Sequence, residues 1–323
     1  MSKVLILSQA KLESATDELC KWLIHYCVPF VRYNGEDLFA LDSLNDMPKN
    51  TDYDLVWFRR RISDYPHVDY SFKTEHVNNA FTVKKFLTDE FKAVYSYLFH
   101  KIDLKKWVND PFSLSALNKL QVLQLAAKHN LNIPFTEVVT TRAAVANILR
   151  AYPQIIVKPL SEVIFLEGEG DTHYKMLTKV IDERNIRYVP VRFFPSLIQE
   201  CIAKKMEIRT FYLFGKFYSM VIYSQNNKNT KEDFRNYDLA RPNRTVPYQL
   251  PEEIEIKLDA LMKDLSFNTG SIDLILTPGG DYIFLEINPE GQFGMVSHPC
   301  NYYLEREMAS AYKEKIAAGL TAS

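Results

Sequence analysis

The sequence lacks the features that mark several large classes of protein. Its 323 residues include only four cysteines, with no Cys-x-x-Cys pair and no spacing typical of a metal site. We expect these cysteines to be structural thiols in a reducing compartment rather than disulfides. No apolar run approaches the length of a membrane span, and Met1 to Ala10 lack the basic start and cleavage pattern of a signal peptide. The sequence therefore predicts a cytoplasmic protein with no membrane partner.

Neither sign of charge is in excess. The chain has 39 Lys and Arg against 40 Asp and Glu, a formal net charge of -1. Because binding to a nucleic-acid backbone needs a basic excess, we expect no nucleic-acid partner. No internal repeat or low-complexity tract interrupts the sequence. At this length, and with 47% hydrophobic residues, the chain can form two or three packed subdomains.

Strand and helix patterns alternate at the start of the chain. Residues 3–8 form a short apolar run, residues 12–27 space apolar side chains at helical intervals, and residues 29–33 suggest a second strand. This order predicts a doubly wound α/β unit. No glycine-rich phosphate loop separates the first strand from its helix, so we do not expect this unit to bind a nucleotide.

Three consecutive arginines follow the next predicted strand. Residues 54–58 are mostly apolar and lead directly into the run Arg59–Arg61. The carboxyl ends of strands are where α/β domains tend to bind ligands, and a guanidinium group can hold a carboxylate with two hydrogen bonds. Two interpretations stay open: a solvated basic corner, or a place where Arg60 or Arg61 binds acidic side chains of a substrate.

The most informative stretch is residues 270–294. A β-rich run, residues 271–277, meets a Pro-Gly-Gly turn, and a second β-rich run, residues 281–288, follows. Turn residues between two such runs predict a β-hairpin.

Two carboxylates are expected to meet across this hairpin. Because side chains alternate along a strand, the second strand should present on one face Phe284, Glu286 and Asn288, and on the other Leu285 and Ile287. Pairing through the turn brings Asp273 close to Glu286. Like charges this close repel and are costly to bury, so a cation is a natural counterpart, and oxygen ligands of this hardness suit Mg²⁺. The alternative is a surface hairpin whose acids are solvated.

The second half of this hairpin resembles a known family. Asp273 followed by residues 286–289 (Glu-Ile-Asn-Pro) resembles the metal-binding end of the ATP-grasp ligases. The resemblance implies that Asp273, Glu286 and Asn288 hold Mg²⁺ between the phosphates of ATP. The continuation, residues 290–292 (Glu-Gly-Gln), resembles one branch in particular, the graspetide maturases that make microviridin-type ω-ester peptides from ribosomal precursors.

Earlier residues match the ATP-grasp order. Lys119, on a predicted helix, and Lys158, closing a strand of β-branched residues, resemble the two lysines that reach the nucleotide phosphates. Arg209 resembles the arginine that stabilises the transferring phosphoryl group. By itself, the alternation of charged and apolar side chains over residues 205–210 predicts only a half-buried strand. The resemblance implies three catalytic residues, Lys119, Lys158 and Arg209.

The resemblance also implies how the nucleotide base is held. The backbone of residues 200–202 resembles the hinge on which adenine lies, with Glu200 or Glu207 near the ribose. A Gly-Glu-Gly segment within residues 167–171 resembles the lid loop over the phosphates. The implied ATP-binding residues are Lys119, Lys158, Gln199, Glu200, Cys201, Ile202, Glu207 and Arg209.

The expected fold class is α/β with α+β subdomains, an ATP-grasp fold preceded by a doubly wound α/β domain. We expect that N-terminal domain to span residues 1–112, the central subdomain with the lid residues 113–190, and the C-terminal subdomain with the magnesium site residues 191–323. Residues 304–320 are predicted to be a final helix of the C-terminal subdomain. Residues 171–192 are the expected place for recognition of a leader peptide.

The resemblance implies an ATP-dependent ligase with Mg²⁺ as cofactor and a precursor peptide, leader plus core, as partner. Glu or Asp side chains of that peptide become acyl phosphates, and Thr, Ser or Lys side chains attack them to form ω-ester or ω-amide crosslinks. A homodimer is also expected, and no residue stands out as a general base. Two alternatives stay open: a small-molecule carboxylate-amine ligase of the same fold, and a regulator that binds nucleotide or peptide without turnover.

Overall fold

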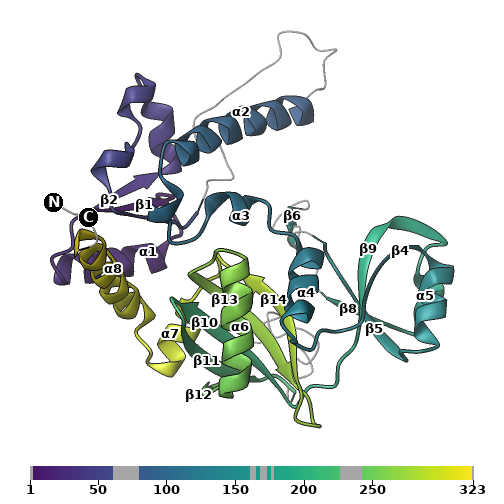
Figure 1. The fold of residues 1–323 in the computed structure, drawn as a ribbon. Helices are drawn as coiled ribbons and strands as arrows, with labels where there is room; N and C mark the ends of the chain where they lie inside the picture. Colours follow the sequence, from purple (N-terminus) through teal and green to yellow (C-terminus); the bar gives the residue numbers. More distant parts are fainter. Residues whose placement is uncertain are drawn as a thin grey trace. The chain divides into compact units, whose positions relative to one another are not determined.

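The chain forms two compact units. Residues 1–115 with 303–323 make the first, and residues 116–302 make the second. The computed structural model (Figure 1) describes residues 3–60, 80–160, 165–167, 173–175, 178–225 and 242–321. None of the described helices has the length and apolar character needed to cross a membrane.

The first unit contains a parallel three-stranded sheet with the order β2-β1-β3. Its strands are β1 (Val4–Ser8), β2 (Phe30–Asn34) and β3 (Leu55–Phe58). Its α-helices are α1 (Ser14–His25), α2 (Ala80–His100), α3 (Pro111–Ser115) and α8 (Leu304–Thr321). Its 3-10 helices are η1 (Gly35–Ala40), η2 (Leu44–Asp46), η3 (Asn50–Asp52) and η4 (Leu104–Lys106).

Helices cover both faces of this sheet. Leu7 and Phe58 belong to the same core cluster as Leu98 of α2. On β3, Trp57 contacts Tyr312 of α8, with ring centroids 6.2 Å apart. Every residue of β1 is buried, as expected of a central parallel strand. This arrangement confirms the doubly wound α/β unit predicted from the sequence.

The final helix groups differently from the prediction. The sequence pattern placed residues 304–320 with the C-terminal subdomain, whereas the structure groups α8 with the first unit. The physical reason is that α8 packs against α1 and β3, a contact between the two ends of the chain. The three predicted ranges, residues 1–112, 113–190 and 191–323, stay a prediction.

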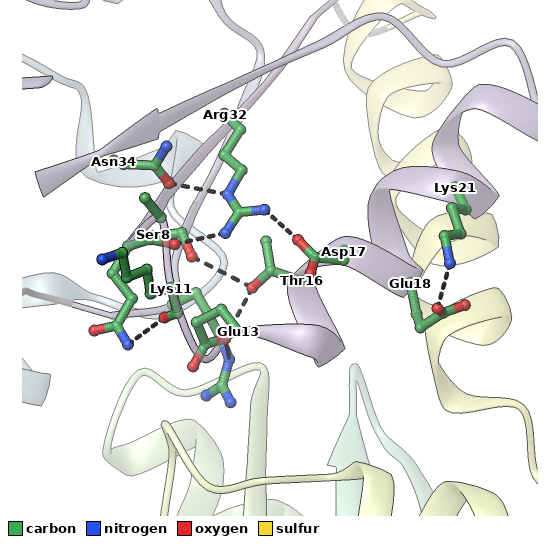
Figure 2. A network of polar contacts seen from close by, with 12 residues as sticks. Ser8, Lys11, Glu13, Thr16, Asp17, Glu18, Lys21, Arg32 and Asn34 are labelled. Atoms are coloured by element: carbon green, nitrogen blue, oxygen red, sulfur yellow. Dashed lines mark hydrogen bonds and ion pairs between the residues drawn. The ribbon is translucent and has the colours of Figure 1, made fainter. Parts of the chain in front are cut away.

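A buried polar network joins the carboxyl ends of β1 and β3 to the start of α1. Figure 2 shows Glu13, Thr16 and Ser8 within it. The Oε2 of Glu13 accepts a hydrogen bond from Thr16 Oγ1 at 3.0 Å and lies 3.1 Å from Arg59 Nε. Its Oε1 is paired with Arg60. Because Glu13 and Arg59 are each only 2% exposed, this network is part of the core.

The second unit begins with a four-stranded antiparallel sheet of order β4-β9-β5-β8. Its strands are β4 (Thr136–Thr141), β5 (Gln154–Lys158), β8 (Lys179–Asp182) and β9 (Arg192–Glu200). A two-stranded sheet joins β6 (Phe165–Glu167) and β7 (His173–Lys175). The helices here are α4 (Lys119–Lys128), α5 (Arg142–Leu149) and the 3-10 helix η5 (Ile186–Tyr188). Val145 and Leu149 of α5 pack on Ile155 and Ile198, which closes one face of the larger sheet.

A five-stranded antiparallel sheet follows, with the order β12-β11-β10-β13-β14. Its strands are β10 (Met206–Leu213), β11 (Lys216–Tyr223), β12 (Arg244–Tyr248), β13 (Thr269–Leu276) and β14 (Tyr282–Asn288). The helices here are α6 (Glu252–Asp264) and α7 (Gly294–Cys300). The amphipathic helix α6 lies across one face of the sheet (Figure 1), and Tyr212 Oη donates to Asp259 Oδ1 at 2.7 Å. The opposite face carries the candidate site.

The predicted hairpin of residues 271–288 is confirmed as β13 and β14. Its turn is closed by hydrogen bonds from Gly280 N to Thr277 O at 3.1 Å and from Thr277 N to Asp281 O at 2.9 Å. Gly280 has a φ of +96°, a conformation that favours glycine because it has no Cβ. The turn residues thus set the register that brings the two strands together.

Candidate functional site

The register of β10, β13 and β14 places the predicted polar residues on one face of the five-stranded sheet. Residues paired across antiparallel strands point to the same face. They form three rows along the strands: a first row of Glu207 and Ile275, a middle row of Arg209, Asp273 and Glu286, and a third row of Phe211, Ser271 and Asn288. The predicted pairing of Asp273 with Glu286 is confirmed.

One detail of that prediction is wrong. Phe284 does not share a face with Glu286, because the register shifts between Asp273 and Leu274 and leaves Leu285 as an extra residue on β14. Phe284 is therefore paired with Leu274 and is fully buried. Such a bulge re-aims side chains. It lets Leu285 and Glu286 both line the pocket described below.

Arg209 and Asp273 form a buried ion pair in the middle row. The Nη1 of Arg209 lies 3.0 Å from Oδ2 and 3.2 Å from Oδ1 of Asp273. Arg209 is 6% exposed and Asp273 is 8% exposed. Removing two charges from water costs several kcal/mol per ion, and their mutual attraction offsets this cost only when the geometry is good. Because a displaced side chain would leave the other charge buried and unpaired, the pair holds both side chains in fixed positions on the sheet.

A pocket of about 470 Å³ lies between the two larger sheets of the second unit. Its walls are the face of the four-stranded sheet opposite α5, the segment joining β9 to β10, and one face of the five-stranded sheet. The predicted residues that line it are Lys158, Gln199, Glu200, Cys201, Ile202, Glu207, Asp273 and Glu286. Of the residues predicted to bind the nucleotide or the metal, Lys119, Arg209 and Asn288 do not line it. A larger hollow of about 630 Å³ lies beside α5 and η5. It is lined by no residue predicted to bind the nucleotide or the metal, but Ile186, Arg187, Val191 and Arg192 of its lining fall in the range predicted for leader recognition.

The two lysines lie near one end of β5. Lys158 is its last residue, and Lys119 Nζ donates to the carbonyl oxygen of Pro159 at 3.3 Å. Lys119 opens α4, where the side chain of Asn118 caps the helix by accepting from Leu120 N at 2.9 Å. The helix start thus carries Lys119 to the strand end that bears Lys158, and the two cations favour an anionic ligand there.

Glu200 and Glu207 differ in what their carboxylates do. Glu200 Oε1 accepts a hydrogen bond from the backbone N of Phe135 at 2.8 Å, so it ties β9 to the start of β4. Glu207 Oε1 accepts from Lys204 Nζ and from Ser224 Oγ, each at 2.7 Å. Both glutamates line the pocket, but only Glu207 lies on the sheet face that also bears Arg209 and Asp273.

Gln199 is held in place by the neighbouring strand. It is 2% exposed, and its Nε2 donates to Thr136 Oγ1 at 3.0 Å. It is paired with Ile156, so both lie on the pocket side of the four-stranded sheet. Two apolar residues also line the pocket: Ile156, from the four-stranded sheet, and the bulge residue Leu285, from the five-stranded sheet. Sequence reasoning missed both, because an apolar strand residue gives no sign of which face it occupies.

Two predictions concern the arginines after β3. Arg60 is paired with Glu13 and its side chain is 31% exposed, so part of its charge is already compensated. Arg61 lies outside the described residues, as do residues 168–171 of the predicted lid. A role of Arg60 and Arg61 in substrate binding stays a prediction.

The predicted metal ligands fit Mg²⁺ in their chemistry. The part of the chain that the structure describes contains no group of three His, Cys, Asp or Glu placed to hold a metal ion. The set Asp273, Glu286 and Asn288 differs from such a group because one donor is an amide. Two carboxylates and an amide oxygen are hard ligands, and Mg²⁺ commonly binds one or two protein carboxylates together with phosphate oxygens and water. In the structure the Asp273 oxygens accept from Arg209, so a cation there would share Asp273 with the guanidinium group.

Comparison with known proteins gives a clear result for the fold. No protein-family model and no curated protein sequence matches the chain. Among solved structures, the RiPP-associated ATP-grasp ligase of Chryseobacterium gregarium, in complex with ADP and a leader and core peptide, is 20% identical with a TM-score of 0.79. That match covers 98% of this chain and 97% of the other.

Two further solved structures have a similar fold over nearly the whole chain. Macrocyclase MdnC from Microcystis aeruginosa MRC, bound with precursor peptide MdnA, is 20% identical with a TM-score of 0.74, over 95% of this chain and 98% of that one. ATP-grasp ligase PsnB, complexed with a phosphomimetic variant of its minimal precursor, Mg and ADP, is 12% identical with a TM-score of 0.73, over 98% and 99%. The chain therefore has the ATP-grasp fold, as its motifs predicted.

Proposed function

We propose that this protein is an ATP-dependent, magnesium-dependent ligase that closes rings in a ribosomally made precursor peptide. The observation that carries the proposal is the middle row of the five-stranded sheet. Arg209, Asp273 and Glu286 sit side by side there, and two of them line a pocket whose opposite wall bears Lys158. The solved ligases of the same fold that bind ADP and peptides support the choice of substrates.

In this proposal the pocket binds ATP. Residues 200–202 hold the adenine through their backbone, and Gln199 belongs to the same wall. Glu207 is the better candidate for the ribose, since the Glu200 carboxylate already accepts from Phe135 N. Lys119 and Lys158 bind the phosphates, as the anion-favouring end of β5 suggests.

Asp273, Glu286 and Asn288 would hold Mg²⁺, which supplies positive charge against the phosphate oxygens. A side-chain carboxylate of the peptide attacks the γ-phosphorus of ATP, giving an acyl phosphate and ADP. A Thr or Ser hydroxyl, or a Lys amine, then attacks the acyl carbon and releases inorganic phosphate and a proton. Each ring therefore costs one ATP and removes one water from the peptide. Arg209 stabilises charge on the transferring group, because its planar fork matches phosphoryl oxygens.

The remaining parts of the proposal concern the peptide and the assembly. Residues 171–192 would recognise the leader, Arg60 and Arg61 would meet acidic side chains of the core, and two copies of the chain would form a homodimer. The proposed domain ranges are 1–112 for the N-terminal α/β domain, 113–190 for the central subdomain and 191–323 for the C-terminal subdomain.

The test is mass spectrometry of a Thr- and Glu-rich peptide encoded beside this gene, incubated with the protein, ATP and Mg²⁺. We expect loss of one or more waters. The double variant Glu286→Gln, Asn288→Ala should abolish it, while the control Glu253→Gln, a change at a 74% exposed side chain on α6, should not. Mild alkali then separates ester links, which open, from amide links, which do not.

Other outcomes would contradict ring closure. ATP consumption with free amino acids, and no mass change in the peptide, would indicate a small-molecule ligase. Nucleotide binding without turnover under any condition would indicate a regulator.

A further inference from the structure

Two buried polar atoms on the site face have no hydrogen-bond partner among the described residues. They are Arg209 Nε and the hydroxyl oxygen of Ser271. Ser271 is 1% exposed and Arg209 is 6% exposed. Leaving a buried donor unsatisfied costs about 1–3 kcal/mol. Tyr33 Oη and Trp107 Nε1 in the core of the first unit are also unsatisfied, so it is the position of Arg209 Nε and Ser271 Oγ on the site face that matters. An unsatisfied pair next to an ion pair therefore suggests a ligand that supplies the missing acceptor.

The position of Ser271 along its strand indicates which part of the substrates this ligand belongs to. The pocket is lined by Ile275 of the first row and by Asp273 of the middle row, but not by Ser271 of the third row. Two residues along a strand correspond to about 7 Å. Ser271 thus lies past the middle row, on the side away from the segment that joins β9 to β10. If the nucleotide fills the pocket with its phosphates at the middle row, the group that receives the γ-phosphoryl must lie past it.

Gly291 closes over both groups. A Cβ at this position would lie 3.1 Å from Arg209 Nη2, 3.1 Å from Ser271 Oγ and 3.0 Å from the backbone oxygen of Asn288. Since real Cβ atoms rarely come this close to another atom, only glycine allows the turn after β14 to lie against the guanidinium group and the hydroxyl. A ligand of the Ser271 hydroxyl would therefore have to enter beside this turn.

We propose that Ser271 is a substrate-contacting residue, whose hydroxyl, together with Arg209 Nε, donates hydrogen bonds to the side-chain carboxylate that receives the phosphoryl group. The inference rests on the proposed function and adds a residue to it. The two donors orient a carboxylate oxygen toward the γ-phosphorus, and they remain partners of the acyl group once the phosphoryl has transferred. Ser271 serves the peptide and not the nucleotide.

The test compares Ser271→Ala with Ser219→Ala. Ser219 is the matched control, because it is a serine of the same sheet, 2% exposed, whose hydroxyl donates to Thr210 Oγ1 at 2.7 Å on the face opposite the site. Three quantities are measured: kcat/KM for the precursor peptide in the water-loss assay, the affinity for ADP with Mg²⁺, and the thermal unfolding midpoint. For Ser271→Ala we expect kcat/KM to fall about tenfold to hundredfold, with ADP affinity unchanged and an unfolding midpoint that does not fall, because the lost hydroxyl has no partner in the fold. For Ser219→Ala we expect a lower midpoint and unchanged kinetics.

Several results would overturn the inference. Unchanged kcat/KM in Ser271→Ala would exclude a contact with the substrate, and an equal loss of ADP affinity would assign the hydroxyl to the nucleotide. A fall in the unfolding midpoint as large as that of Ser219→Ala would mean that the hydroxyl stabilises the fold, and this result counts even if the wild type makes no product. Failure of the wild type to remove water from the peptide contradicts the proposed function, whereas failure of Ser271→Ala to differ from it contradicts only the role of Ser271.

Discussion

In the part of the chain that the structure describes, each of the two units has a buried arginine–carboxylate pairing, and the two pairings differ in what surrounds them. In the first unit Glu13 is paired with Arg59 and Arg60 and also accepts from Thr16 Oγ1. In the second unit Arg209 uses Nη1 to hold both oxygens of Asp273, while its Nε has no partner among the described residues. The Glu13 carboxylate is thus shared among three donor residues, whereas Arg209 keeps one N–H donor, Nε, without an acceptor among the described residues.

This difference distinguishes a network that stabilises the fold, around Glu13, from one that belongs to the candidate site, around Arg209. A buried polar network whose members are all satisfied rigidifies a core, whereas an unsatisfied member costs free energy that a ligand can recover. Glu13 lies where three elements of the first unit meet, so its network fixes β1, α1 and β3. Arg209 lies beside a pocket, and the unsatisfied hydroxyl of Ser271 lies against the same glycine, Gly291, as its guanidinium group. Both pairs have buried charges, and only the one with leftover donors is expected to act on a substrate.

The largest effect is expected for Glu13→Gln. The change removes the buried negative charge that pairs with Arg59, which is 2% exposed, and with Arg60, so we expect the free energy of unfolding to fall by about 3–5 kcal/mol. The kcat of ring closure per folded molecule, measured at saturating precursor peptide, should stay the same. Urea denaturation measures the first quantity and the water-loss assay the second. The control Glu18→Gln removes an exposed partner of Lys21 on the same helix and should leave the urea midpoint in place. A loss of turnover with intact stability would make Glu13 part of the site.

Arg209→Lys tests the other pair. Lysine keeps a positive charge beside Asp273 but lacks the planar fork, so the protein should remain folded while kcat falls about hundredfold to thousandfold. Circular dichroism and the water-loss assay give the two readings. A variant that unfolds, or one that folds and retains most of its kcat, would remove the distinction between the two pairs.

Local chemistry explains what could be predicted from the sequence. The Pro-Gly-Gly turn and the alternation of side chains were enough to pair Asp273 with Glu286, and the alternation around residue 207 placed Glu207 and Arg209 on one face. These inferences need only the period of a strand and the residues of a turn. The motif order then identified the ATP-grasp fold.

Long-range contacts explain what could not be predicted. Alternation alone placed Phe284 on the wrong face, because a bulge changes the count of residues without changing the pattern of their types. The Glu200 carboxylate binds the backbone of Phe135, a partner 65 residues away that no local pattern indicates. The hydroxyl of Ser271 likewise lies against Gly291, which belongs to the turn after the neighbouring strand. No local pattern around Ser271 indicates this contact.

An exposed ion pair of the second unit is expected to contribute least to the free energy of unfolding. Asp264 of α6 lies 2.8 Å from His129 Nε2 and 3.4 Å from Lys128 Nζ, which links α6 to the end of the helix that begins with Lys119. The hydrogen bond with His129, followed by that with Lys128, lowers the pKa of Asp264 below its ordinary value of 3.8.

A lowered carboxylate pKa means that the unfolded chain binds the proton more tightly than the folded one. The stabilisation from Asp264 is therefore present above about pH 3.8 and is lost as the pH falls through the lower pKa of the folded state. We expect Asp264→Asn to lower the unfolding midpoint slightly at neutral pH, with the difference from wild type shrinking to nothing in acid. Thermal unfolding of both proteins across this range checks it. A difference that does not change with pH would mean that Asp264 acts through packing, and that an exposed pair behaves like the buried network of Glu13.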